Sequence, residues 1–225
     1  QTCALPISTR PLARAGDFSI WPGGPAAIRA VHERGLHSEG LSDRFGGSLR
    51  SPSFELTHDV VSVLARGDGN ARLRLVIENH QGDALLFGSV NPNLAGVTSL
   101  RWYRLPIRSQ WRGARAHVEI MTRDDKPNLS QMKDASLIDR SDGRSAFGIA
   151  QVLQHPHNAA PSEAPVVPAE LVTDICRTPS ELAERFSRTT ESALSRWNAE
   201  QATDADARWL NACLEAGLQI GRAHV

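Results

Sequence analysis

The stretch DVVSVLA-RGDGN-ARLRLVIE, residues 59–78, decides the fold class. Residues 59–65 are mainly apolar and β-branched. Residues 71–78 alternate apolar and polar side chains, a period of two that is typical of a half-buried antiparallel strand. The five residues between them are rich in the types that form hairpin turns. We therefore predict that residues 59–78 form a β-hairpin.

Further strand patterns lie on both sides of this stretch. We predict strands at residues 54–56, 84–87, 99–105, 116–122, 136–138 and 147–153. Spacings of about a dozen residues or less, with Gly, Asn and Pro between, are typical of an antiparallel β-sandwich or jelly roll. Because no strand–helix–strand alternation is present, a Rossmann or barrel enzyme fold is not expected. The predicted fold class is mainly β.

The C-terminal part has a helical pattern. Residues 155–168 contain four prolines and no periodicity, which indicates a linker or surface loop. The sequence TPSE from Thr178 to Glu181 is a capping box with proline at the first helical position. The apolar stripe expected on this first helix is Leu182, Phe186, Ala193, Leu194 and Trp197.

A second helix is expected to begin at the cap formed by Thr203 and Asp206 and to end at Gly217. The residues predicted to share one of its faces are Ala207, Leu210, Cys213 and Leu214. Together the two helices form a C-terminal α-helical hairpin. Such a hairpin must pack on the sandwich or on another domain, because it cannot bury its apolar stripe alone.

The charge balance excludes some classes of partner. The chain has 25 Lys and Arg against 25 Asp and Glu, so its formal net charge is zero. A nucleic-acid-binding domain normally shows a basic excess, and a membrane span needs about 20 apolar residues in a row. We therefore expect no nucleic-acid partner and no membrane span.

The two ends of the sequence are related through their possible codons. Residues 219–225 can be encoded by CAG-ATC-GGA-AGA-GCA-CAC-GTC, and the reverse complement, with TG following, encodes the first seven residues. A sequencing adapter leaves such a relation at the two ends of an insert. We therefore expect residues 1–8 and 219–225 to be adapter-derived and exclude them from fold reasoning.

The remaining chain is expected to be a piece of a longer protein. Its predicted parts are a β-sandwich domain at 9–154, a Pro/Ala-rich linker at 155–177 and a truncated helical segment at 178–218. With Cys3 assigned to the adapter, Cys176 and Cys213 remain. These two cysteines either form a disulfide or are buried thiols.

Several motifs carry a family resemblance. They are LHS (36–38), LSDR (41–44), GSLRSPSF (47–54), RW (101–102), WRGARAHVE (111–119), DGRSAFGIA (142–150), WLN (209–211) and AGL (216–218). This set resembles the middle region of large planctomycete-type proteins, in which a cytochrome-c-like segment is followed by two family-specific domains of unknown function. The most specific motifs are 47–54 and 111–116 together.

The resemblance implies an exported protein, periplasmic or at the cell surface, of bacteria that degrade complex polysaccharides. It also implies a sandwich of galactose-binding or concanavalin-like character beside a helical domain. The chain lacks the haem-attachment motif Cys-x-x-Cys-His. Any haem therefore belongs to flanking sequence, and we expect no cofactor in this piece.

Carbohydrate binding is the ligand chemistry that the sequence favours most. Sugar rings stack on aromatic side chains, and planar polar groups make paired hydrogen bonds to hydroxyls. The candidate ligand-binding residues are Trp102, Tyr103, Trp111 and Arg115. Alternation places Trp102 and Arg104 on one face of their strand and Tyr103 and Leu105 on the other. In the structural alternative, Trp111 packs at the sandwich rim and the C-terminal helices cover Trp102.

Other polar residues give weaker indications of binding or catalysis. Arg50 could anchor a ligand carboxylate or sulfate, but a buried ion pair with Asp43, Glu55 or Asp59 is the stronger expectation. The HSEG stretch at 37–40 lacks the nucleophile-elbow pattern of a hydrolase. No catalytic residue is predicted, because Glu119 has no evident carboxylate partner for glycoside hydrolysis.

Metal-binding patterns are weak. His155 and His157 could both reach one ion but lack a third ligand at a characteristic spacing. The aspartates at 124, 125, 139 and 142 supply oxygens of the kind that bind a structural calcium. Aspartate-rich turns are commoner than calcium sites, so no metal site is predicted.

The leading functional hypothesis is a non-catalytic β-sandwich module of a larger exported protein, which binds a polysaccharide or positions the flanking domains of the same chain. In one alternative, the chain is part of a polysaccharide-active enzyme whose catalytic residues lie in the flanking domains. A pure scaffold is the other alternative.

Overall fold

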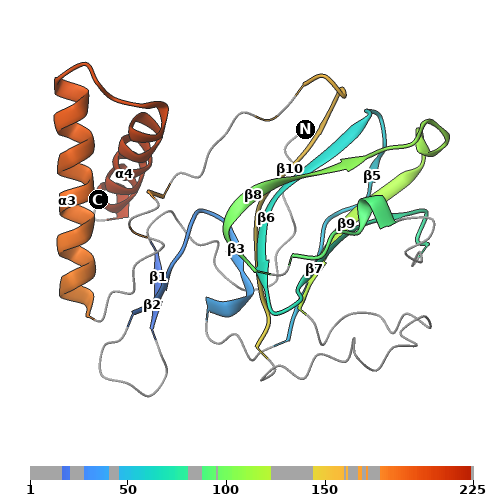
Figure 1. Ribbon diagram of the computed structural model, residues 1–225, viewed down its shortest axis with the longest axis horizontal. Helices are drawn as coiled ribbons and strands as arrows, with labels where there is room; N and C mark the ends of the chain where they lie inside the picture. Colours follow the sequence, from blue (N-terminus) through green and yellow to red (C-terminus); the bar gives the residue numbers. More distant parts are fainter. Residues whose placement is uncertain are drawn as a thin grey trace. The chain divides into compact units, whose positions relative to one another are not determined.

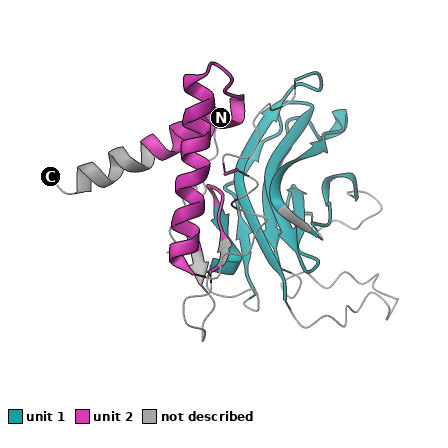
Figure 2. Ribbon diagram, turned by 60° about the vertical axis from the view of Figure 1, so that its left-hand side comes forward, with its two compact units in different colours: residues 1–11, 36–162 teal, residues 12–35, 163–225 magenta. Residues whose placement is uncertain are grey.

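The computed structural model (Figure 1) describes residues 17–20, 28–40, 46–80, 88–94, 96–122, 144–159, 161, 167–168, 171 and 178–223. Its contacts divide the chain into two compact units (Figure 2). Unit 1 comprises residues 1–11 and 36–162, and unit 2 comprises residues 12–35 and 163–225. Among the described residues, no helix has the length and hydropathy needed to cross a membrane.

Unit 1 contains two antiparallel sheets (Figure 1). The strand order of the first sheet is β3 (Leu36–His37), β10 (Ala146–His155), β6 (Val60–Asp68) and β8 (Val97–Pro106). The second sheet contains β4 (Ser48–Arg50), β5 (Phe54–Glu55), β9 (Arg115–Met121) and β7 (Arg72–Ile77). Three short 3₁₀ helices accompany the strands: η1 (Ser38–Gly40), η2 (Gly88–Val90) and η3 (Ser109–Trp111).

The central strand of the second sheet is β9. Met121 is opposite Ser48 of β4 and also opposite Arg72 of β7, so these two strands lie on opposite edges of β9. The short strand β5 continues the edge that β4 begins, with Phe54 opposite Ala116. Both edges of β9 are therefore paired with neighbouring strands along most of the strand's length.

One hydrophobic core joins both sheets. Because side chains alternate along a strand, every second residue of β6, β7 and β9 enters this core. These residues are Val61, Val63, Ala65, Leu73, Leu75, Ile77, Ala116, Val118 and Ile120. The described residues are mainly β, with two larger antiparallel sheets in unit 1 and two C-terminal helices, which confirms the predicted class and is consistent with a β-sandwich.

The predicted hairpin at 59–78 is wrong in its pairing. Both strands exist, but β6 pairs with β10 and β8, whereas β7 pairs with β9. The reason is that both edges of β6 are taken, one by β10 and the other by β8, so no edge is left for β7. Both faces of β6 are also buried: Val60 and Ser62 are inaccessible although they point away from the core. The turn between β6 and β7 therefore carries the chain from one sheet to the other.

The other strand predictions fall into two groups. Strands at 54–56, 99–105, 116–122 and 147–153 are confirmed as β5, β8, β9 and β10. The segments 84–87 and 136–138 lie outside the described residues. Strands β3 and β4, of two and three residues, were not predicted.

Unit 2 combines a hairpin of β1 (Phe18–Ile20) and β2 (Ile28–Val31) with helices α3 (Pro179–Asn198) and α4 (Asp204–Ala223). Its core is formed by Ile28, Val31, Val167, Leu171, Leu182, Ala193 and Trp209. No pattern in the sequence indicated that residues 12–35 group with the helices.

The helix starts are confirmed. The Glu181 backbone N–H donates to Thr178 Oγ1 at 3.2 Å, and the Glu181 carboxylate accepts from the Thr178 N–H at 3.3 Å. At α4 the Asp206 N–H donates to Thr203 Oγ1 at 3.2 Å. These local signals were predictable because each involves residues three apart.

The predicted apolar stripes need correction. Leu194, Trp197 and Leu214 are 46%, 54% and 64% exposed. On α3, Leu194 lies on a different side of the helix from the buried Leu182 and Ala193, and Trp197 lies in the last turn. Trp209 takes their place in the core: its ring lies 4.9 Å from that of Phe186, and its Nε1–H donates to Thr190 Oγ1.

Two further predictions concern the end of the chain. Helix α4 continues through Gly217 to Ala223, because an interior glycine costs a helix only about 1 kcal/mol and does not by itself end it. Cys213 is a half-buried free thiol, and burial raises its pKa. Cys176 lies outside the described residues.

We predict that Gly69→Ala destabilises unit 1. Gly69 has φ +57°, and a Cβ there would lie 1.9 Å from the Arg144 carbonyl oxygen. The free energy of unfolding should fall by about 2 kcal/mol or more, measured by thermal unfolding followed by circular dichroism. Gly47→Ala, whose Cβ meets nothing within 4 Å, is the control. Equal midpoints for the two variants would contradict this account of the turn.

Candidate functional site

The outer face of the second sheet carries a cluster of charged side chains. Residues that alternate with the core positions of β9, β7 and β4 point to this face. We call the set Arg50, Arg72, Arg74, His117 and Glu119 the charged face. All five residues belong to unit 1.

Glu119 is the centre of the charged face. In the sheet register it stands opposite Arg50 on β4 and opposite Arg74 on β7. Its Oε2 accepts from Arg74 Nε at 2.7 Å and lies 2.5 Å from Arg74 Nη2. Its Oε1 lies 3.0 Å from His117 Nε2. Both carboxylate oxygens are therefore engaged.

The protonation of His117 follows from its partners. Arg50 Nη2 lies 3.2 Å from His117 Nδ1, and a guanidinium can only donate, so Nδ1 accepts. The Nε2 nitrogen then carries the proton and donates to Glu119. Burial lowers the pKa of His117, and the charges of Arg50 and Arg74 lower it further against the opposing effect of Glu119. His117 is thus a neutral imidazole at neutral pH.

Glu119 is ionised although it is largely buried. Burial by itself would raise its pKa, but hydrogen bonds from Arg74 and His117 outweigh that effect and hold the pKa below its ordinary value. The carboxylate therefore neutralises one guanidinium inside the cluster. Sequence reasoning missed this ion pair because Arg74 and Glu119 are 45 residues apart and meet only through the strand register.

Arg50 does not form the ion pair that was expected with Glu55 or Asp59. Asp59 pairs with Arg112 instead, and Asp43 lies outside the described residues. The exposed Arg50 side chain makes its hydrogen bonds to His117 and, at 3.4 Å, to Asn79 Oδ1. Both of these partners are neutral.

The aromatic candidates lie elsewhere in unit 1. Trp102, on β8, is half-buried and points away from the core, whereas Tyr103 is buried in it. Arg101 Nε donates to Tyr103 Oη at 2.9 Å. Trp111, on η3, is buried in the core beneath the guanidinium of Arg108.

The four predicted ligand-binding residues are therefore not brought together on one face. Trp102 belongs to the first sheet, and Tyr103 and Trp111 are 9% exposed core residues. Arg115 is exposed and lies on the same side of β9 as His117 and Glu119, because these positions alternate with the core residues. Of the four, Arg115 alone extends the charged face.

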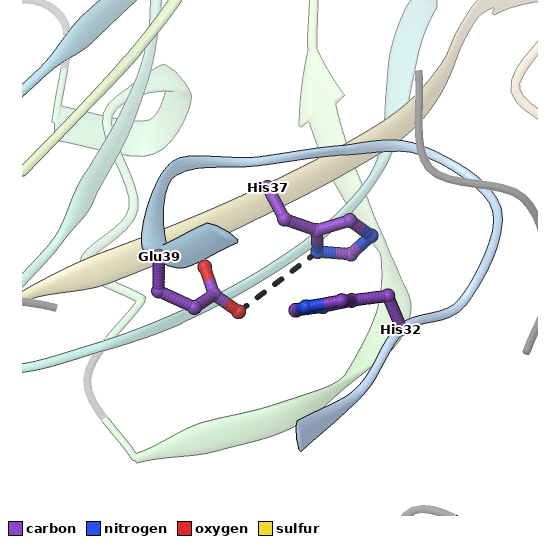
Figure 3. Close-up of side chains that lie close together, drawn as sticks. All are labelled: His32, His37 and Glu39. Atoms are coloured by element: carbon purple, nitrogen blue, oxygen red, sulfur yellow. Dashed lines mark ion pairs between the residues drawn. The ribbon is translucent and has the colours of Figure 1, made fainter. Parts of the chain in front are cut away.

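A second polar cluster contains His37, Glu39 and Arg66. Figure 3 shows His37 and Glu39 turned toward one another, with 4.0 Å between His37 Nδ1 and Glu39 Oε1; His32, also drawn there, belongs to unit 2. Imidazole and carboxylate are metal-ligand types. Arg66, however, forms an ion pair with Glu39 and donates to His37 Nδ1 at 3.3 Å. Its guanidinium already supplies the positive charge between them, which disfavours a metal ion at this pair.

Ser62, His155 and Ser38 of unit 1 make structural contacts. Ser62 Oγ lies 2.7 Å from His155 Nε2, whose ring donates through Nδ1 to the Pro156 carbonyl at 2.8 Å. This resembles an activated serine, but Ser62 is completely buried. His155 has thereby used both ring nitrogens, which removes it from a site shared with His157. Ser38 Oγ accepts from the Phe147 N–H. The aspartates at 124, 125, 139 and 142 lie outside the described residues.

Comparisons with family models, with curated proteins and with solved structures found no match to this chain.

We predict that Glu119→Gln lowers the free energy of unfolding at pH 7 by about 3 kcal/mol, the usual cost of removing one partner from a buried ion pair. Because the pKa of Glu119 is lowered in the folded state, its contribution is complete above its ordinary value near 4.5 and is lost as the pH falls through the lowered value. The difference between wild type and variant, measured by urea unfolding, should therefore shrink below pH 4.5.

The matched control is Glu191→Gln, an exposed position on α3 with the same change of charge. It should leave the unfolding free energy within about 0.5 kcal/mol of wild type. A Glu119→Gln protein as stable as this control at pH 7 would show that the ion pair contributes nothing.

Proposed function

We propose that unit 1 is a non-catalytic module of a larger exported protein and that it binds carbohydrate. The observation that carries the proposal is the charged face, where planar polar groups from three strands stand in register around Glu119. Guanidinium, carboxylate and amide groups make the paired hydrogen bonds that sugar hydroxyls accept and donate. In this proposal the fold is a jelly roll of galactose-binding or concanavalin-like type.

Arg50, the exposed member of the charged face, and the neighbouring Asn79 support a binding role. Arg50 and Asn79 are exposed beside the buried His117, so their donors and acceptors can meet a ligand while the imidazole holds the arginine in place. Side chains that are fixed by neighbours lose less conformational entropy on binding than free ones. A preorganised pair of polar side chains of this kind suits the hydroxyl groups of a sugar.

The motifs of the family resemblance support the proposal that unit 1 belongs to a larger exported protein. Segments 47–54 and 111–116 are neighbours in the second sheet: Leu49 stands opposite Ile120, and Phe54 stands opposite Ala116. Trp111, from the second motif, is buried in the core. The most specific residues of the resemblance thus build the sheet that presents the charged face, in a protein that we propose is exported and carries flanking domains.

A non-catalytic role is favoured because the candidate catalytic side chains are engaged by neighbours or buried. Both oxygens of Glu119 are engaged by Arg74 and His117, and Ser62 is buried. Glycoside hydrolysis needs two carboxyl groups with separate access to the glycosidic bond. No second carboxylate contacts Glu119 among the residues that the structure describes.

A second candidate function is positioning of neighbouring domains. It is favoured by the exposed Leu194 and Trp197, three residues apart on α3, and by the burial of the aromatic candidates Tyr103 and Trp111. A helix face of this type is suited to contact another protein surface. Under this function unit 1 has no ligand of its own.

The test is affinity electrophoresis of the whole 225-residue chain through gels that contain neutral and acidic polysaccharides, with circular dichroism as the control for folding. Carbohydrate binding predicts retardation by at least one polysaccharide. Trp102→Ala, on the other sheet, should not change the retardation if the charged face is the binding surface. A folded chain that no polysaccharide retards would contradict carbohydrate binding and leave the positioning function.

A further inference from the structure

His117 uses its two ring nitrogens in opposite ways. Its Nδ1 accepts from Arg50 Nη2 at 3.2 Å, and its Nε2–H donates to Glu119 Oε1 at 3.0 Å. The first of these bonds exists only while Nδ1 carries no proton, because a guanidinium has donors alone. The contact between Arg50 and His117 therefore depends on the protonation state of the imidazole.

The charges that act on His117 come from three strands. Arg50 on β4 and Arg74 on β7 disfavour the imidazolium, whereas Glu119 on β9 itself favours it. Further charged groups on this side of the sheet, or beside it, are Arg72, Arg115, Glu55 and Glu78. The two arginines that act on the ring therefore oppose one carboxylate.

Burial and these charges set the range in which His117 gains a proton. The residue is 2% exposed, and burial together with the two guanidinium groups holds the pKa of His117 below its ordinary value of 6.5. Glu119 has a lowered pKa and stays ionised in weak acid, so a charged ring keeps one anionic partner at Nε2. We therefore expect the ring to be neutral at pH 7 and to gain its proton in weak acid while unit 1 stays folded.

A proton on Nδ1 removes the more buried of the two contacts that hold the Arg50 side chain. The ring then turns an N–H and a positive charge toward the guanidinium, so repulsion replaces the hydrogen bond. The other contact, from Arg50 Nη2 to Asn79 Oδ1, is 3.4 Å long and joins two exposed residues. Because Arg50 is exposed, its side chain can turn into solvent without opening the core.

We infer that His117 controls Arg50 by proton binding: the neutral imidazole holds the guanidinium beside Asn79, and the imidazolium releases it to solvent. The preorganised pair of Arg50 and Asn79 then exists at neutral pH and is lost in weak acid, so a ligand that needs both binds less tightly there. This consequence for a ligand rests on the proposed carbohydrate-binding function. The release of Arg50 itself requires no ligand.

The release is measured by NMR on the nitrogen-15-labelled 225-residue chain, without ligand, between about pH 7 and about pH 4.5, the range between the ordinary pKa values of His and Glu. Long-range spectra report the tautomer and the titration of each imidazole, and the His117→Gln variant identifies the His117 signals. The heteronuclear NOE of Arg50 Nε reports side-chain motion on the ps–ns timescale. We expect the Nε2–H tautomer of His117 at pH 7 and a loss of order at Arg50 with the same midpoint as the titration of His117, below pH 6.5.

Variants and an internal control make the assignment specific. Arg50→Met removes both the charge and the donor to Nδ1 and should raise the titration midpoint of His117 by about one pH unit. Arg188→Gln, at an exposed position on α3, makes the same change of net charge and should leave the midpoint unchanged. Arg112 should keep its order over the whole range, because the pKa of its partner Asp59 is lowered and the carboxylate stays ionised. In His117→Gln, the order of Arg50 should no longer depend on pH.

Three results would overturn the release of Arg50. They are a His117 ring that stays neutral down to the lowest pH of the titration, an Arg50 side chain whose order is unchanged while His117 titrates, and unfolding of the chain within this range, followed by circular dichroism. The last would mean that His117 gains its proton only in the unfolded state.

Affinity electrophoresis on both sides of the His117 midpoint then tests the consequence for a ligand. A polysaccharide that retards the chain at pH 7 should retard it less below the midpoint. Equal retardation at both pH values would overturn the control of binding by His117. Absence of retardation at both would remove the carbohydrate-binding function and leave the release of Arg50, measured without ligand, in place.

Discussion

The pairing of β9 on both edges is the constraint on which unit 1 depends. Strands β4 and β5 occupy one edge and β7 the other, so the register of β9 fixes the position of three other strands. That register sends Val118 and Ile120 into the core and His117 and Glu119 to the opposite face. A slip of one residue would exchange these sets and bury the charges in the core. The core and the charged face are consequences of the same hydrogen bonds.

On the charged face, some charged groups are neutralised by neighbouring side chains and others are not. Glu119 tolerates burial because Arg74 and His117 together saturate its two oxygens. His117 in turn holds Arg50 through Nδ1 without supplying a negative charge. The positive charge that remains on the charged face belongs to Arg50 and Arg72, which flank β9 on opposite edges.

Local patterns and long-range pairing differ in how well they could be predicted. The alternation in residues 71–78 and 116–122 indicated two strands and their core faces, and TPSE at 178–181 indicated a helix start, because both signals lie between near neighbours in sequence. The pairing of β6, the partners of Glu119 and the role of Trp209 in unit 2 were missed. Each depends on which strand edges or helix faces meet, and a single sequence carries little information on that.

The aromatic candidates illustrate the same limit. Tyr103 and Trp111 are residue types used in both cores and sugar-binding surfaces, and their neighbours in sequence do not distinguish the two. Arg115, predicted for its planar charged group, lies on the same side of β9 as His117 and Glu119. The alternation of residues 71–78 was predicted, but without the register nothing linked Arg72 and Arg74 of that stretch to Arg50.

The position of β6 between β8 and β10 has a consequence for the order of folding. Ser62 of β6 contacts His155 of β10 across 93 residues of chain, so this edge of β6 has no partner until nearly all of unit 1 has been synthesised. Contacts of such long sequence separation slow folding, and an open apolar strand edge is a template for aggregation. A polypeptide that stopped before β10 would leave this edge of β6 without its partner strand.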